Sequence, residues 1–348
     1  MHVGQRGELP YAVRPEKTNG KCCLRVAGGT FLVCSEVFMK KLIGTKDLPK
    51  EEWLRIRKRG LTGTDAGAIT GLNPFRSAFD VWEDKLSDGI DDYDNEAMRQ
   101  GRDLESYVAQ RFSEETGLKV RNVNYVCQNE DHPILLADFD RMIVGENSGL
   151  ECKTVSPYSA DRWSNGQIPP WYIMQAQHYL AVSGCDTWYM AALIFGKDFI
   201  IRRIDRDEEI ISNLITIEER FWNEYVLKHV MPEPDGTRRC SEQIAEMFLH
   251  SDREKTVTLN GYKQILDRRV EIEDLIKKLE SEKDMIDQKI KLEMEDAAYA
   301  TAEGYRISWV CSESQRFDSK RFKEEKPDLY SAFCTTSTCR RFSVKPAA

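Results

Sequence analysis

Between residues 47 and 231 the sequence alternates between helical and strand-like patterns, and this alternation constrains the fold more than any other feature. The helical patterns cover residues 105–115, 171–183 and 206–230. The strand-like runs form two pairs, 133–144 with 149–154 and 187–195 with 198–204, each joined by a short turn that contains glycine. Alternating elements of this kind predict an α/β fold, with a small mixed central sheet flanked by helices.

The clearest break in the chain is Pro232-Glu-Pro-Asp-Gly236, because the residue before a proline avoids the helical conformation. Beyond it, apolar residues recur every seven positions at Ile265, Ile272, Leu279 and Ile286. This pattern predicts a helix of roughly forty residues that pairs with itself, with another subunit or with its own body. The predicted segments are an N-terminal β-hairpin extension at 1–46, the α/β core at 47–231, a linker at 232–253, the heptad helix at 254–303 and a basic α+β extension at 304–348.

The composition excludes several classes of protein. Apolar residues make up 41% of the chain and include 14 Phe, 13 Tyr and 7 Trp, which excludes wholesale disorder. No run approaches the about 18 apolar residues of a spanning helix, and the N-terminus lacks the apolar stretch of a secretory signal. Ten scattered cysteines are therefore expected to be reduced thiols in a cytoplasm. The net charge of −8 excludes a uniformly basic coat, although residues 304–348 hold nine Lys/Arg against five Asp/Glu, a net +4.

The strongest chemical signal is Asp140 followed by Glu151-Cys152-Lys153. Side chains alternate across a strand, so Glu151 and Lys153 point to one face and Cys152 to the other. If the two strands pair across the turn at 145–149, Asp140 comes beside Glu151, and two carboxylates form the oxygen-rich site that Mg²⁺ or Mn²⁺ needs. The lysine can hold or deprotonate a water and stabilise phosphate charge. The same residues are also compatible with an ordinary hairpin that carries a surface Glu–Lys pair.

Three neighbouring features favour the site over the ordinary hairpin. Glu105 lies in a helix ahead of the hairpin, and Gln175 lies on a helix after it. Arg57 precedes a predicted helix start capped by Thr64 or Asp65, where free N–H groups beside a cation suit a phosphate. Each feature also has a purely structural interpretation, as a capping carboxylate, a polar residue on a packed helix, or a simple cap.

In this order the motifs resemble the YqaJ-type viral recombinases, relatives of phage lambda exonuclease in the PD-(D/E)XK nuclease superfamily. The similar blocks are WLRIRKRGLTGTDAGAITG at 53–71, GRDLE at 101–105, Asp140 with LECKT at 150–154, and MQAQHYL at 174–180. Together they span residues 47–209, about half of the chain. The family usually has Asp-Gly at the metal aspartate, whereas Asp140 here precedes Arg141, and Asp138 is a competing carboxylate.

The resemblance implies a PD-(D/E)XK nuclease core with a catalytic Mg²⁺, for which Mn²⁺ would substitute. Asp140 and Glu151 would bind the metal, with the backbone carbonyl of Cys152 as a third ligand. Glu105 would complete the site directly or through water.

The same resemblance implies roles for four further side chains. Lys153 would activate the attacking water, and Gln175 would orient the water or the lysine. Arg57 and Thr64 fall where lambda-like enzymes grip a terminal 5′ phosphate.

The implied activity is 5′-to-3′ exonuclease digestion of double-stranded DNA ends, which leaves 3′ overhangs for recombination. The implied partners are DNA ends, a single-strand annealing protein and further copies of the chain in a homo-oligomer such as a trimeric ring, with no membrane. A phage or prophage origin would place the protein in the cytoplasm of a bacterial host. Two alternatives remain open, namely another nuclease of the superfamily (an endonuclease or a single-strand exonuclease) and a non-catalytic protein that binds DNA ends.

Overall fold

The computed structural model describes residues 16–18, 21–25, 31–33, 39–89 and 94–345. The chain divides into two compact units, Met1–Met247 and Phe248–Ala348. The first unit contains the residues of both predicted strand pairs, and the second contains the heptad helix. No helix among the described residues is long and apolar enough to cross a membrane.

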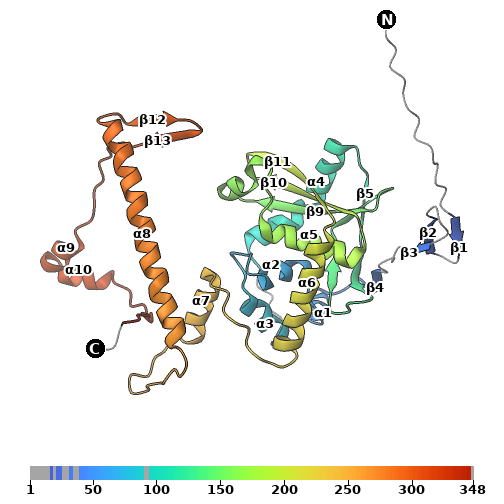
Figure 1. Cartoon of the computed structure of the whole chain (residues 1–348), viewed down its shortest axis with the longest axis horizontal. Coiled ribbons are helices and arrows are strands. Elements are labelled where there is room, and N and C mark those ends of the chain that lie inside the picture. Colours follow the sequence, from blue (N-terminus) through green and yellow to red (C-terminus); the bar gives the residue numbers. More distant parts are fainter. Residues whose placement is uncertain (1–15, 19–20, 26–30, 34–38, 90–93, 346–348) are drawn as a thin grey trace, which may run out of the picture. The chain divides into compact units, whose positions relative to one another are not determined.

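A five-stranded mixed sheet forms the centre of the first unit (Figure 1). Its strands in spatial order are β11 (Asp198–Asp205), β10 (Thr187–Ile194), β9 (Ser148–Val155), β8 (Arg141–Ile143) and β5 (Val120–Asn122). Strands β9 and β10 run parallel, whereas the other neighbours run antiparallel. The predicted α/β class with a mixed sheet is confirmed, and so is the strand pair 187–195 with 198–204. The prediction of one strand over 133–144 is wrong, because the chain changes sheets at Phe139 and Asp140. Leu136–Asp138 pairs with Tyr125–Asn129 in a second sheet, and only Arg141–Ile143 pairs with Ser148–Val155.

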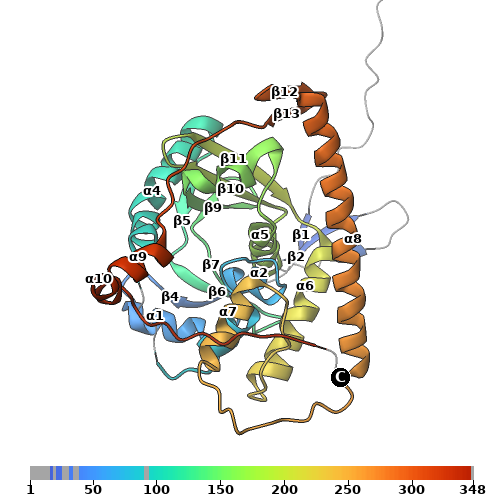
Figure 2. The same cartoon turned by 90° about the vertical axis from the view of Figure 1, so that its left-hand side faces the viewer.

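Helices cover both faces of this sheet (Figure 2). Helix α4 (Glu96–Thr116) packs Phe112 against one face, beside Leu150. Helix α5 (Pro170–Ser183) packs Leu180 against the other face, beside Trp188. Because side chains alternate along β9, Glu151 and Lys153 share the α5 face, whereas Leu150 and Cys152 share the α4 face.

A second, antiparallel sheet and further helices complete the first unit. The sheet has the order β4 (Met39–Gly44), β6 (Tyr125–Asn129) and β7 (Leu136–Asp138). The helices are α1 (Lys50–Arg57), α2 (Gly63–Ile69), α3 (Ala78–Leu86), α6 (Glu208–Phe221) and α7 (Arg238–Met247), with a 3-10 segment at Pro157–Gly166. Strand β4 therefore joins the core although it lies in the segment 1–46 that was predicted as an extension.

The N-terminal strands β1 (Glu16–Thr18), β2 (Lys21–Arg25) and β3 (Phe31–Val33) form an antiparallel sheet of their own. The pairing of β2 with β3 confirms the predicted hairpin, whose glycine turn lies outside the described residues.

Helix α6 differs from its predicted extent, and helix α7 was not predicted. Helix α6 passes at Trp222 into a π-helical turn, Trp222–Val226, so the predicted α-helix over 206–230 is interrupted. The turn keeps both Phe221 and Val226 buried in one apolar cluster. Helix α7 lies within the segment predicted as a linker, where Gln243 is buried and accepts a hydrogen bond from Ser77 Oγ at 2.8 Å.

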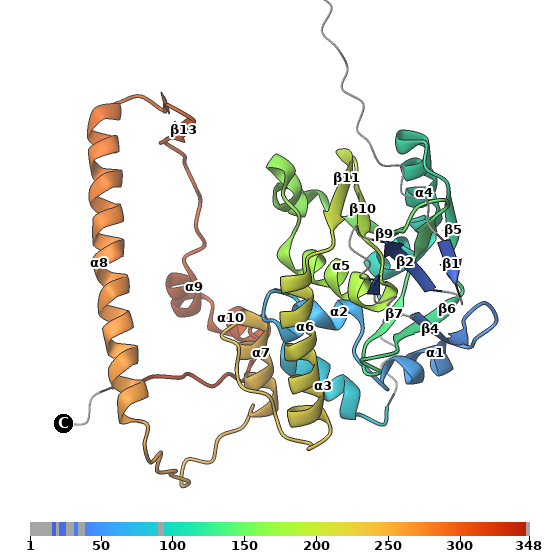
Figure 3. The same ribbon diagram turned by 45° about the vertical axis from the view of Figure 1, so that its right-hand side comes forward.

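The second unit is organised around α8 (Lys263–Met294), a helix of 32 residues (Figure 3). Its other elements are β12 (Tyr299–Ala302), β13 (Tyr305–Ser308), α9 (Ser319–Glu325) and α10 (Pro327–Ala332). The helix is shorter than predicted because the backbone turns to positive φ on both sides, at Gly261 (φ 80°) and at Glu295 (φ 47°).

We expect Gly149→Ala to destabilise the first unit by about 1–3 kcal/mol, the usual cost of overpacking a core. Gly149 pairs with Trp188 across β9 and β10, and a Cβ at this position would lie 2.3 Å from the fully buried indole. Denaturant unfolding should show the loss, whereas Gly89→Ala, whose Cβ would meet none of the described atoms within 4 Å, should leave the midpoint unchanged. Equal midpoints for the two variants would contradict this packing.

Candidate active site

The pairing of β8 with β9 brings Asp140 beside the Glu151-Cys152-Lys153 segment. Arg141 pairs with Leu150, so Asp140, directly before β8, lies next to Glu151. Asp140 Oδ2 accepts a hydrogen bond from the backbone N–H of Cys152 at 2.8 Å. The competing carboxylate, Asp138, instead forms an ion pair with Arg57 at 2.9 Å.

Glu151 is the most constrained carboxylate of the group, with 5% of its surface exposed. Its Oε1 accepts hydrogen bonds from Lys153 Nζ at 2.7 Å and from Gln175 Nε2 at 2.8 Å. Its Oε2 is buried and has no hydrogen-bond partner among the described residues. A buried carboxylate oxygen without a partner is costly, and with the second carboxylate of Asp140 beside it this atom could serve as a cation ligand.

The electrostatics of the site are those of crowded carboxylates. Burial, and next the charges of Glu151 and Glu105, raise the pKa of Asp140 well above its usual range. Burial lowers the pKa of Lys153, but the charge of Glu151 outweighs burial and the net pKa is raised. Lys153 is therefore an ammonium ion here, and it neutralises only part of the negative charge of the group.

Helix α5 supplies the amide that orients Glu151. Gln175 is 2% exposed, and its Nε2 also donates to the hydroxyl of Tyr179 at 2.9 Å, one helical turn further on. Helix α2 approaches this side so closely that a Cβ on Gly63 would lie 2.5 Å from the Tyr179 ring. The start of α2 is thus separated from Glu151 by only two side chains.

The Arg141 side chain is not directed toward the α5 face. It is 8% exposed, and its Nη1 donates to Glu105 Oε1 on α4 and to the backbone carbonyl of Asp140 at 2.7 Å. Glu105 is therefore near enough to raise the pKa of Asp140, while its carboxylate is bound to a guanidinium. No role was assigned to this ion pair from the sequence, and the cation directly after Asp140 was the available signal.

Arg57 and Thr64, the predicted phosphate residues, lie in contact. Arg57 Nη2 donates to Thr64 Oγ1 at 3.3 Å and to Thr62 Oγ1 at 3.2 Å. The predicted cap of α2 at Thr64 or Asp65 is wrong, because the helix begins at Gly63 with Thr62 as its N-cap. The reason is a capping box, in which Asp65 Oδ2 accepts the Thr62 N–H at 2.8 Å from the third helical position.

A buried ion cluster below this helix start was not anticipated. Asp65 (1% exposed) pairs with Lys85 at 3.0 Å and with Arg76. Burial raises the pKa of Asp65, but the charges of Lys85 and Arg76 outweigh it and hold the pKa well below its usual range. Lys85 Nζ also donates to the backbone carbonyl of Arg57 at 3.0 Å, so the cluster fixes the end of α1. The Thr-x-x-Asp spacing indicates the capping box, but not the cations that pair with Asp65.

Within the described residues, no three His, Cys, Asp or Glu side chains are grouped so that they could hold a metal ion by themselves. Asp140 and Glu151 could hold one together with a backbone oxygen, and the unpaired Glu151 Oε2 fits that use.

The chain is similar to proteins of one family. The YqaJ-like viral recombinase domain matches residues 52–186. "Uncharacterized protein YqaJ" of Bacillus subtilis (strain 168) is 34% identical over 308 residues, which cover 87% of this chain and 97% of that protein. Among solved structures, an alkaline exonuclease (LHK-Exo) from Laribacter hongkongensis is 20% identical with a TM-score of 0.44, and covers 57% of this chain and 100% of its own. A phage-related exonuclease from Haemophilus somnus 129PT is 12% identical with a TM-score of 0.40, and covers 51% and 99%.

Proposed function

This chain belongs to the YqaJ-like viral recombinase family, and from that premise we propose that it is a divalent-metal-dependent exonuclease acting on the ends of double-stranded DNA. The observation that carries the proposal is the buried, unpaired Oε2 of Glu151 beside Asp140 and Lys153. An unpaired buried oxygen also occurs at Glu218, which has no second carboxylate beside it among the described residues, so the proposal rests on the combination of the unpaired Oε2 with Asp140 and Lys153.

Mg²⁺, with Mn²⁺ as a substitute, would be held by Asp140, Glu151 and the backbone carbonyl of Cys152. A bound cation of this kind polarises a phosphoryl oxygen and lowers the pKa of a bound water. Glu105, which is paired with Arg141, would act through a water rather than as a direct ligand.

Two further side chains, Lys153 and Gln175, would take part in hydrolysis. Lys153, as an ammonium ion held by Glu151, would donate to the attacking water and stabilise the negative charge that develops on the phosphate. Gln175 would fix the carboxylate of Glu151, because one amide bridges Glu151 and Tyr179. We propose that digestion proceeds from the 5′ end and leaves 3′ single strands for a single-strand annealing protein.

The proposal is tested by incubating the full chain with Mg²⁺ and linear duplex DNA labelled at one 5′ end or at the opposite 3′ end. Early release of the 5′ label as mononucleotide, absent in EDTA, is the expected result. Cleavage of circular DNA at the same rate would indicate an endonuclease instead. DNA that is bound but intact in every lane would leave only a protein that binds DNA ends.

We expect Arg57→Ala to weaken binding of 5′-phosphorylated duplex by about 10- to 150-fold. This factor corresponds to the free energy that hydrogen bonds to a charged group usually contribute. Arg57 is held by Asp138 and directed at the hydroxyls of Thr62 and Thr64, so its guanidinium is already oriented. Binding of the same duplex with a 5′ hydroxyl should change much less. Fluorescence anisotropy without metal measures both affinities.

Arg55→Ala is the matched control, because Arg55 lies on the same helix but is 65% exposed and, among the residues that the structure describes, pairs only with Glu51. It should leave the preference for 5′ phosphate intact. A preference that survives Arg57→Ala as well would remove Arg57 from the phosphate site.

A further inference from the structure

Two aromatic rings and a guanidinium meet at the surface of the first unit. Phe75 and Trp171 have ring centroids 6.0 Å apart at an interplanar angle of 89°. Arg162 Cζ lies 5.3 Å from the centroid of each ring. These three side chains, here called the aromatic platform, come from the α2–α3 loop, from the first turn of α5 and from the 3-10 segment.

The fold holds Phe75 out of the core. Phe75 is 65% exposed, although its own backbone and the next residue are anchored. The Phe75 N–H donates to Asn73 Oδ1 at 2.9 Å, and the next residue, Arg76, is paired with the buried Asp65. One exposed ring is common on protein surfaces, but Phe75 lies against Trp171 and Arg162, and such a contiguous group is a candidate ligand site.

Trp171 is equally fixed. It rests directly on α2, where a Cβ on Gly67 would lie 2.7 Å from the Trp171 Cβ. Its indole and Arg162 also border a hollow of about 640 Å³, further lined by Pro169, Pro170 and Ile173. A hollow of this size lies within the roughly 300–1,000 Å³ range of small-ligand sites.

The aromatic platform is continuous with the candidate active site through Tyr172. The Tyr172 ring centroid is 5.5 Å from that of Trp171 and 4.8 Å from Lys153 Nζ. Lys153 in turn donates to Glu151. A ligand on the platform would therefore lie within a few nucleotide lengths of Lys153, given about 3.4 Å of rise per nucleotide in a DNA strand.

We propose that the aromatic platform binds an unpaired nucleobase of the DNA strand that enters the active site. Aromatic faces stack on any base, and an arginine beside them adds a cation for the adjoining phosphate. A purely apolar partner would have no use for Arg162 and no reason to lie beside Lys153. This proposal rests on the proposed nuclease function, because that function is what identifies the strand near Lys153 as DNA.

The test is a double-mutant cycle between protein and DNA. The full chain is titrated in EDTA, which prevents hydrolysis, with a duplex that carries a four-nucleotide overhang of normal bases or of abasic residues. Wild type should prefer the normal overhang by about 5- to 150-fold, the range of base–aromatic stacking. Phe75→Ala and Trp171→Phe should lose part or all of this preference, whereas Phe75→Tyr should keep it. Thermal unfolding of each variant shows whether the fold persists.

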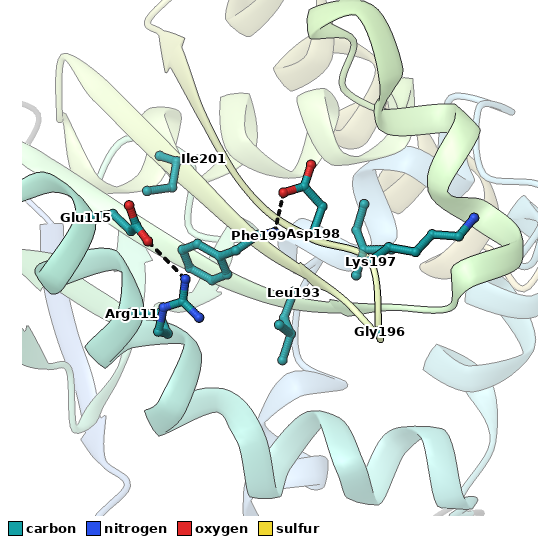
Figure 4. A pocket seen from close by; sticks show the side chains of 9 residues that line it. Arg111, Glu115, Leu193, Gly196, Lys197, Asp198, Phe199 and Ile201 are labelled. Carbon is teal, nitrogen blue, oxygen red and sulfur yellow. Dashed lines mark hydrogen bonds and ion pairs between the residues drawn. The ribbon is translucent and has the colours of Figure 1, made fainter.

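Arg111→Ala is the control for Arg162→Ala. Arg111 also stacks on a ring, with its Cζ 4.9 Å from the centroid of Phe199, but that pair lines a shallow pocket of about 740 Å³ on the α4 face (Figure 4). Arg162→Ala should weaken binding to the overhang DNA and lessen its salt dependence, and Arg111→Ala should do neither.

The outcomes separate the two proposals. If wild type binds overhang and blunt DNA but does not distinguish normal from abasic overhangs, the aromatic platform is not a base site and the proposed nuclease function is untouched. The same holds if Phe75→Ala keeps the full preference. If wild type binds no DNA in any form, the proposed function itself fails.

Discussion

Replacing Lys153 by Met is expected to lower the rate constant of DNA hydrolysis by about 10²- to 10⁴-fold, the usual contribution of a group that moves or holds a proton or stabilises developing charge. Met keeps an unbranched side chain that ends at the ε-carbon, and it removes the ammonium ion that donates to Glu151 at 2.7 Å. Single-turnover release of nucleotides at saturating enzyme measures the rate constant of hydrolysis independently of the affinity for DNA.

Two further variants distinguish chemistry from folding. Met leaves Glu151 buried without its cation, so Lys153→Met should also unfold at a lower temperature. Lys153→Arg restores the charge and should restore stability, but it should recover only part of the activity, since a planar guanidinium cannot place its nitrogens where Nζ stands. Lys197→Met, on the exposed β10–β11 turn, should have no effect. Full activity in Lys153→Met would remove this residue from the mechanism.

The centre of the candidate site was predictable because it depends on local patterns. Strand periodicity alone places Glu151 and Lys153 on one face of β9, and a glycine turn is enough to return Asp140 to Glu151. Helical spacing also places Gln175 and Tyr179 on one face of α5, where they are hydrogen-bonded. These relations span at most twelve residues, which is the range over which periodicity carries information.

Contacts that join distant segments left a signal for at most one of the two partners. Arg141 reaches Glu105 across 36 residues, and Lys85 reaches Asp65 across a helix and a loop. The entry of β4 into the second sheet likewise depends on pairing with β6, some eighty residues later. A charged residue is normally predicted to lie on the surface, because its partner cannot be identified from the sequence. Sequence patterns therefore miss buried ion pairs.

The buried pair of His178 and Glu218 is the extreme case, since both side chains are 0% exposed. His178 Nδ1 lies 2.8 Å from Glu218 Oε1, and Nε2 lies 2.9 Å from the backbone carbonyl of Leu136. Both neighbours are acceptors, so both ring nitrogens donate and the imidazole is protonated. The pair ties α5 and α6 to β7, the strand that precedes Asp140.

Glu218→Leu is expected to destabilise the first unit by about 3–5 kcal/mol, because it leaves a buried imidazolium without its counter-ion. His132 and Glu219 form the matched control, a His–Glu pair at 2.7 Å in which the side chains are 32% and 44% exposed. His132→Gln should cost at most about 1 kcal/mol, as for other exposed pairs. Denaturant unfolding of the two variants gives both values, and equal losses would contradict a buried charge at His178.

The same pair predicts how stability depends on pH. Burial lowers the pKa of His178, but the charge of Glu218 and the hydrogen bonds to Glu218 and Leu136 outweigh it, so the folded pKa lies above the usual 6.5. Below about pH 6.5 the stabilisation is fully present, because folded and unfolded chains both bind the proton. Above that pH the unfolded chain releases the proton first, so the stabilisation declines and is lost as pH rises through the folded pKa. The free energy of unfolding of wild type should therefore fall from pH 6 upward more steeply than that of His178→Gln, and parallel profiles would mean that His178 is neutral in the fold.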